Sequence, residues 1–64
     1  MKSNNLALYR KKNGYTQKEL AKILDTSQNQ ISKYEKGEQE MNINRYIKLA
    51  ILYKVSIDQL CGLK

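Results

Sequence analysis

The sequence predicts an all-α domain of five short helices, and two observations lead to this prediction. The 64 residues include no proline and only three glycines, so few positions interrupt a helix. Signals for helix starts recur between segments whose apolar residues are spaced by three and four positions. We expect one compact domain over residues 1–64, with helices at about 4–12, 17–24, 28–36, 43–53 and 57–61.

The first two helices are separated by a glycine and a capping signal. Leu6 and Tyr9 lie on one side of the first helix, which ends in a basic turn before Gly14. Cations favour the negative end of a helix, and glycine there can take the left-handed conformation. Thr16 and Glu19 then form the pattern of a capping box, which predicts the start of the second helix.

The third and fifth helices begin with the same type of signal. Ser27 with Gln30, and Ser56 with Gln59, have the spacing of capping boxes. Gly37 follows a lysine at the predicted end of the third helix, as Gly14 does after the first. These paired starts and stops therefore indicate short helices with defined ends.

The fourth helix is the most apolar of the five, and Asn42 is its expected N-cap. Its apolar residues recur at helical spacing, which predicts that they pack into the core. The expected core residues of this helix are Ile43, Tyr46, Ile47, Leu49, Ala50 and Tyr53.

Residue composition argues against an enzyme and against a bound metal or cofactor. The chain has no histidine and one cysteine, Cys61, so the commonest metal ligand is missing and an internal disulfide cannot form. No nucleophile stands near a base in the sequence. Because we find no signal peptide and no long apolar run, we expect a soluble cytoplasmic protein.

The charge is strongly basic, at a formal net +6. Residues 1–36 hold eight of the twelve Lys and Arg residues and only three of the six Asp and Glu residues. Such an excess favours a polyanionic partner, although a well-solvated surface is the alternative explanation.

Only Asp25, Thr26 and Ser27 separate the second helix from the third. A turn of three or four residues between two short helices is the helix-turn-helix arrangement. One residue of such a turn is usually left-handed, and Asp25 is the candidate because aspartate tolerates that conformation.

The third helix has a polar outer face. Asn29, Lys33 and Lys36 lie opposite Ile31, and Gln28 stands in the first turn. Asparagine and glutamine can bond adenine at its major-groove edge, and lysine can donate to guanine. We therefore expect Gln28, Asn29 and Lys33 to read base pairs of double-stranded DNA, with an ordinary solvated helix face as the alternative.

Several segments resemble one known family. YTQKELA at residues 15–21 and ISKYEKG at residues 31–37 are similar to the Cro and phage-repressor type of helix-turn-helix protein, also called Xre-like. IKLA at residues 47–50 and VSIDQL at residues 55–60 extend the resemblance. It covers about residues 6–60 and implies a lambda-repressor-like fold and a sequence-specific transcriptional regulator, a repressor.

The resemblance also implies roles for individual residues. Gln17, at the positive end of the second helix, would bind a DNA phosphate. Arg10 and Glu35 match a pair that forms a partly buried ion pair between the first and third helices. The other residues expected at the DNA backbone are Thr16, Ser27, Ser32 and Lys36.

The chain departs from the family pattern at two places. Many relatives have glycine where Asp25 stands, so some strain is expected in this turn. Many relatives also have a basic loop after the third helix, whereas this chain has Glu38 and Glu40. These carboxylates would repel a phosphate backbone, unless the loop turns away or meets a basic partner protein.

Two further expectations concern partners. A single short recognition helix reads few base pairs, so we expect a homodimer on a pseudo-palindromic operator, at least when bound to DNA. The alternative function is a protein-interaction module, antitoxin-like or accessory, that binds DNA weakly. The C-terminal surface expected for pairing contains Ile51, Leu60, Cys61 and Leu63. The alternative would use the acidic loop and an exposed Ile23, Ile51 or Leu63.

Overall fold

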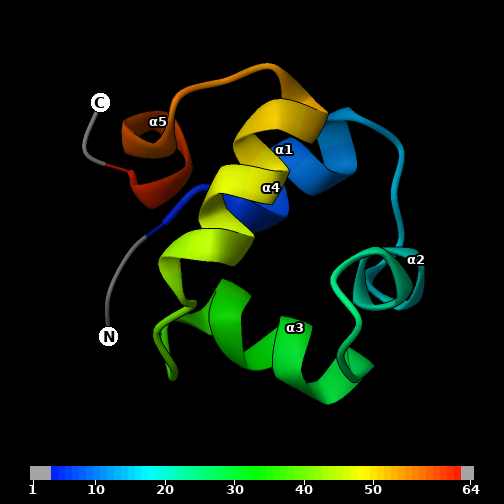
Figure 1. Ribbon diagram of the computed structural model, residues 1–64. Helices are drawn as coiled ribbons and strands as arrows, with labels where there is room; N and C mark the ends of the chain where they lie inside the picture. The colour runs from blue at the N-terminus through cyan, green and yellow to red at the C-terminus, as the bar shows by residue number, and fades with distance from the viewer. Residues whose placement is uncertain (1–3, 63–64) are drawn as a thin grey trace.

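The computed structural model describes residues 4–62, and Leu63 lies outside this range. Over that range the chain forms five helices and no strand, which confirms the predicted all-α class (Figure 1). None of these helices is both long and apolar enough to span a membrane. The helices are α1 (Leu6–Lys12), α2 (Gln17–Ile23), α3 (Gln28–Lys36), α4 (Ile43–Tyr53) and α5 (Ile57–Cys61).

Side-chain caps begin α2, α3, α4 and α5. Thr16 and Ser56 form complete capping boxes with Glu19 and Gln59. At α3 the box is half-formed, because Ser27 Oγ accepts from the Gln30 amide at 3.1 Å but the Gln30 side chain does not return to the cap. The Gln30 Nε2 atom is instead buried, without a hydrogen-bond partner among the described residues. Because the Gln30 amide is buried, its side chain does not reach back to the exposed N-cap. The complete capping box expected at Ser27 and Gln30 was therefore wrong.

The first helix begins at Leu6, two residues later than expected, because Asn4 and Asn5 bind the ends of other helices. Asn4 Nδ2 donates to the Tyr34 carbonyl at 2.9 Å, and Asn5 Nδ2 donates to the Gln59 carbonyl at 2.8 Å. Those carbonyls belong to the last turns of α3 and α5, where they also accept from the C-cap amides of Gly37 and Gly62. The segment before α1 therefore joins helices that are far apart in the sequence.

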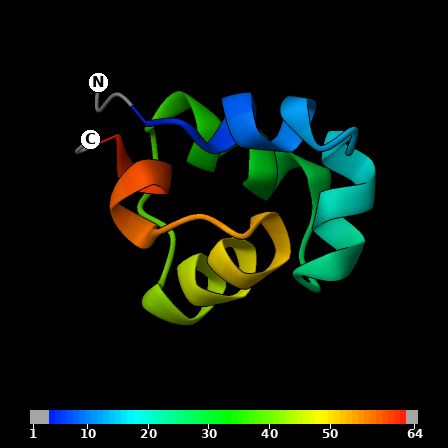
Figure 2. The same cartoon turned by 90° about the horizontal axis from the view of Figure 1, so that it is seen from above.

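The helices enclose one small core. Figure 1 shows α3 along the lower edge, α2 beside it and α4 in front of α1. Figure 2 places α1 and α4 on opposite sides of the molecule, so the core lies between them. The buried apolar residues are Leu6, Leu20, Ala21, Leu24, Ile31, Tyr34, Met41, Leu49, Tyr53 and Leu60.

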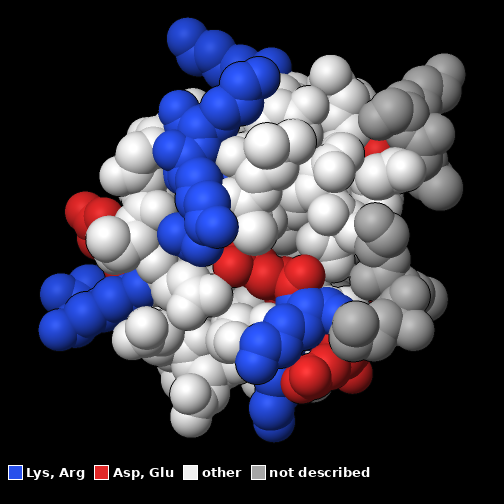
Figure 3. Space-filling model, turned by 180° about the vertical axis from the view of Figure 1, so that it is seen from behind, with Lys and Arg blue, Asp and Glu red and all other residues white. Residues whose placement is uncertain are grey.

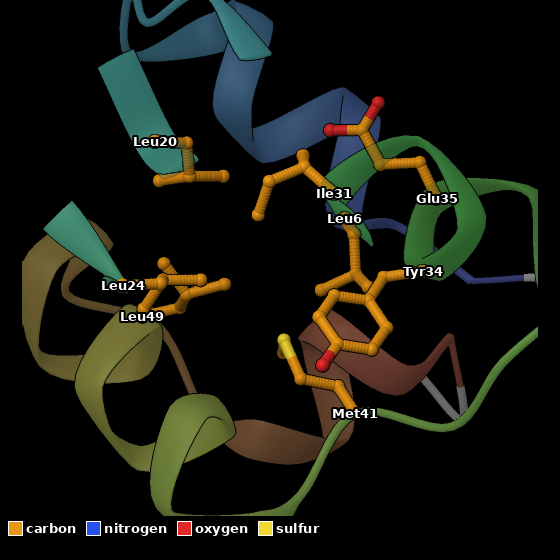
Figure 4. Close-up of a pocket in the computed structure, with 8 residues that line it drawn as sticks. All are labelled: Leu6, Leu20, Leu24, Ile31, Tyr34, Glu35, Met41 and Leu49. Carbon is orange, nitrogen blue, oxygen red and sulfur yellow. The ribbon is translucent and has the colours of Figure 1, made fainter. Parts of the chain in front are cut away.

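Several helices meet at a small hollow in this core (Figure 4). Leu20 of α2, Leu24 just after α2, Ile31 of α3 and Leu49 of α4 point into it. Glu35 is the one charged residue of the lining, and its carboxylate points away from the hollow. The apolar side chains thus fill the centre, while the charged group of α3 is directed elsewhere.

The expected core face of α4 is partly wrong. Leu49 and Tyr53 are buried, but Ile43 is 58 % exposed and Ile47 is 43 % exposed. A domain of this size has a thin core, so α4 buries one face against it and its opposite face remains outside. Met41, in the loop before α4, is the buried residue that the periodicity did not indicate.

Gly14 allows a test of backbone conformation alone. Its φ is +80°, and a Cβ added there would meet no atom within 4 Å. We expect Gly14→Ala to destabilise the fold by about 1–2 kcal/mol, because an L-residue is strained in the left-handed region. Urea unfolding followed by circular dichroism would measure this loss. Gly14→Asn is the control, and equal losses for the two variants would contradict the explanation.

Tyr53 provides a prediction about alkaline pH. Burial, and then the nearby Glu35 carboxylate, raises the Tyr53 pKa from 10.0 to about 12. The folded state therefore keeps a proton that the unfolded state releases, so the free energy of unfolding should fall as pH rises from about 10 to about 12. Tyr53→Phe should reduce that fall.

The same variant should stabilise the fold at neutral pH. The Tyr53 hydroxyl is buried without a hydrogen-bond partner among the described residues, so its removal should add about 1 kcal/mol. Urea unfolding at neutral and alkaline pH would measure both effects. Tyr9→Phe, at a half-buried position of α1, is the matched control. A clear loss of stability in Tyr53→Phe at neutral pH would show that the hydroxyl has a partner after all.

Candidate nucleic-acid interface

A tight turn fixes α3 relative to α2. Asp25 has φ 56°, so it takes the left-handed conformation expected for this turn. The turn is closed by backbone hydrogen bonds from Asp25 N to the Lys22 carbonyl at 3.2 Å and from Thr26 N to the Ala21 carbonyl at 2.8 Å. Ser27 then caps α3. The structure thus contains a helix-turn-helix unit, formed by α2 and α3.

The outer face of α3 carries the residues that we expect to read bases. Gln28, Asn29 and Lys33 are all exposed. On the opposite face Ile31 and Tyr34 are buried in the core. The packing of α3 therefore leaves one polar face open along its length.

The residues expected at the DNA backbone lie around that face. Thr16, Ser27 and Lys36 are exposed, whereas Gln17 and Ser32 are half-buried. The first turn of α3 contains no acidic residue, so its positive end has no internal counter-charge. At α2, the Glu19 carboxylate accepts from the Thr16 amide at 2.9 Å. Hydrogen bonds with Thr16 are also the main reason that the Glu19 pKa lies below its usual value.

An ion pair between α1 and α3 lies under this surface. Arg10 Nε donates to Glu35 Oε2 at 2.6 Å, and Arg10 Nη2 donates to Glu35 Oε1 at 3.2 Å. Their side chains are only 10 % and 7 % exposed. Arg10 Nη1 also donates to the Tyr15 carbonyl at 2.9 Å, just before α2. One guanidinium thus connects α1, the start of α2 and α3.

Sequence reasoning missed the link between Gln17 and this pair. Gln17 Nε2 donates to Glu35 Oε1 at 2.9 Å, although the two residues are 18 positions apart. The side-chain amide of the expected phosphate ligand is therefore held by the carboxylate of α3. No local signal could have predicted this contact, because it depends on how α2 and α3 pack.

A second missed contact joins α4 to α3. Arg45 Nη1 donates to the Tyr34 hydroxyl at 2.6 Å, and the guanidinium lies 5.9 Å from the centre of the Tyr34 ring. Tyr34 is otherwise buried beneath the outer face of α3. Arg45 therefore holds the C-terminal half of α3 from the start of α4.

The surrounding charges are mainly but not uniformly basic. Figure 3 shows a column of Lys and Arg side chains on the face hidden in Figure 1, ending at Asp and Glu side chains. α1 lies on this side of the molecule (Figure 1), and its last turn includes the exposed Lys11 and Lys12. In the loop after α3, Glu38 and Glu40 are exposed. Positive potential therefore extends beyond α3, while the loop after it is acidic.

The five-helix fold, the short turn and the exposed polar face of α3 define a helix-turn-helix protein. The chain belongs to the Helix-turn-helix family, whose model matches residues 6–60.

A curated relative in this family is the HTH-type transcriptional regulator ImmR of Bacillus subtilis (strain 168). It is 43 % identical to this chain over 53 residues, which are 83 % of the chain and 42 % of the relative. The chain thus spans less than half the length of that regulator.

The buried ion pair gives a sharp prediction of stability. Arg10→Met should destabilise the fold by about 3–5 kcal/mol, because it leaves the Glu35 carboxylate buried without its counter-charge. The double variant Arg10→Met/Glu35→Leu should recover most of this loss, since apolar side chains can replace a buried ion pair. Urea unfolding of both variants would measure the difference.

The neighbouring Lys11 provides the control for this prediction. Lys11 is exposed, so Lys11→Met should change stability by less than about 0.5 kcal/mol. If Arg10→Met were as mild as Lys11→Met, the pair would not be a structural requirement.

Proposed function

We propose that this chain is a sequence-specific regulator of transcription that binds double-stranded DNA through the major groove and acts as a repressor. The observation that supports this most strongly is the open face of Gln28, Asn29 and Lys33 on a helix fixed by its neighbours. A curated relative is named as a transcriptional regulator. We assign the chain no catalytic step.

Base reading would use the outer face of α3, from its first turn to Lys33. Gln28 and Asn29 carry amides that can bond both major-groove positions of adenine, and Lys33 can donate to guanine O6 and N7. These side chains are exposed on a helix whose other face is buried. Little ordering of the backbone would therefore be needed on binding, which favours affinity.

Backbone contacts would come from both helix starts. The first amides of α2 and α3 have no acceptor within their own helix, so they can donate to phosphate oxygens. Gln17 Nε2 has one hydrogen on Glu35 and a second available for a phosphate. The remaining contacts proposed here are Thr16, Ser27, Ser32 and Lys36, at the exposed or half-buried edge of the same surface.

Pairing on a pseudo-palindromic operator would double the sequence that is read. The C-terminal surface expected for this contact needs correction, because Leu60 is fully buried. Cys61 is half-buried, and Ile51 is the exposed apolar residue among the members of that group within residues 4–62. A bound dimer would deny the same groove to other proteins, which is the physical basis for repression.

Selection from a pool of random duplexes is the direct test of the proposal. We expect one enriched sequence, with half-sites about one helical turn apart if the chain binds as a pair. Its affinity should fall steeply with salt, because Lys and Arg replace counterions on the phosphates. No preference for the enriched duplex over random DNA in fluorescence titration would contradict the proposal. Negligible DNA affinity at low salt, together with a stable protein complex, would favour the protein-interaction module.

Two lysines should behave differently on the selected duplex. Lys33→Ala should cost about 1–3 kcal/mol of binding and relax the preference at one base pair. Lys11→Ala should weaken all duplexes evenly and reduce the slope of affinity against salt. Both residues are exposed, so neither change should affect folding. Similar behaviour of the two variants would show that α3 does not read bases.

A further inference from the structure

An apolar stripe runs along the outside of α4. Ile43, Ile47 and Ile51 are spaced by four residues, and they are 58 %, 43 % and 73 % exposed. This spacing places them on one side of the helix. Single exposed apolar residues are common, but three on one helix face form a continuous patch, and such patches mark interaction sites.

The charged residues of α4 itself and of its two caps all have one sign. Residues 42–57, which include the whole of α4, contain Arg45, Lys48 and Lys54 but no Asp or Glu. Lys48 and Lys54 are exposed next to the stripe. The α4 surface is therefore apolar along its centre and positive at its rim.

A second copy of the chain fits this surface poorly in the absence of DNA. A symmetric pair would bring the lysines of both copies to one interface, between two molecules that each carry a formal net charge of +6. A stable interface also buries about 800 Å² on each side, and three partly exposed isoleucines supply only a fraction of that area. A partner with acidic side chains would be attracted to Lys48 and Lys54, whereas a second copy would be repelled by them.

We propose that the α4 surface docks an acidic amphipathic helix of a partner protein, with apolar side chains on Ile43, Ile47 and Ile51 and carboxylates near Lys48 and Lys54. Helices commonly bind through apolar residues at spacings of three and four, and flanking charges select the partner. The small patch suits weak, transient docking. Because α4 and the outer face of α3 are different surfaces, a partner on α4 would leave the base-reading residues open. At Ile51 it would compete with the pairing of two copies on DNA.

Two synthetic peptides test the chemistry of this surface. Each is about 18 residues long, which is enough to form a helix, with leucines along one face. One peptide has glutamates on both flanks, and the other has lysines there. Titration into ¹⁵N-labelled protein should shift amides at residues 43–54, with the acidic peptide binding at least about tenfold more tightly.

Point variants distinguish docking on α4 from nonspecific binding of the peptides. Ile47→Asp and Ile51→Asp should abolish the shifts, and Ile51 is so exposed that its change should not affect folding. Leu8→Asp is the matched control, because Leu8 is 54 % exposed but lies on α1. Lys48→Glu should weaken the acidic peptide and strengthen the basic one.

Three outcomes would overturn the proposal. They are equal binding of the two peptides, shifts outside α4, and self-association of the free protein that Ile47→Asp removes in sedimentation. The last result would assign the surface to a second copy. Duplex binding by these variants is measured separately, so failure of the docking proposal can be distinguished from failure of DNA binding.

Discussion

A guanidinium and a carboxylate, each almost completely removed from water, join α1 to α3 at the centre of the structure. Isolated charges in such a position would be strongly destabilising, so each must be satisfied by partners. Arg10 meets this requirement with three hydrogen bonds, two to Glu35 and one to the Tyr15 carbonyl. Glu35 accepts from Arg10 through both oxygens and also from Gln17. The pair therefore constrains three helices at once.

This constraint connects stability to the proposed DNA surface. Gln17 stands at the start of α2, and its amide is held by a residue of α3. Arg45 holds α3 from the other side through Tyr34. A small apolar core alone would allow helices to shift against one another, whereas directed polar bonds define their orientation. The outer face of α3 is thus fixed by residues that need not touch DNA.

The outer face of α4 and part of the loop before it remain exposed because the core of this small domain is thin. Met41 anchors the loop in the core, while Glu38 and Glu40 stay outside. The exposed isoleucines of α4 lie beyond the core because the helix buries only its opposite face. One small fold thereby offers a polar surface on α3 and an apolar, basic-rimmed surface on α4, each with its own chemistry.

The class of fold, the approximate helices and the left-handed turn at Asp25 could all be predicted before the structure, because they depend on residues within a few positions of one another. The sequence also indicated the exposed polar face of α3, because a helix that buries Ile31 and Tyr34 on one side has its other side in solvent. The packing of the helices, in contrast, places Ile47 outside the core, buries the Gln30 side-chain amide and brings Glu35 to Gln17. Those outcomes depend on which helices lie opposite one another, and helical periodicity shows that a face is apolar without showing what covers it.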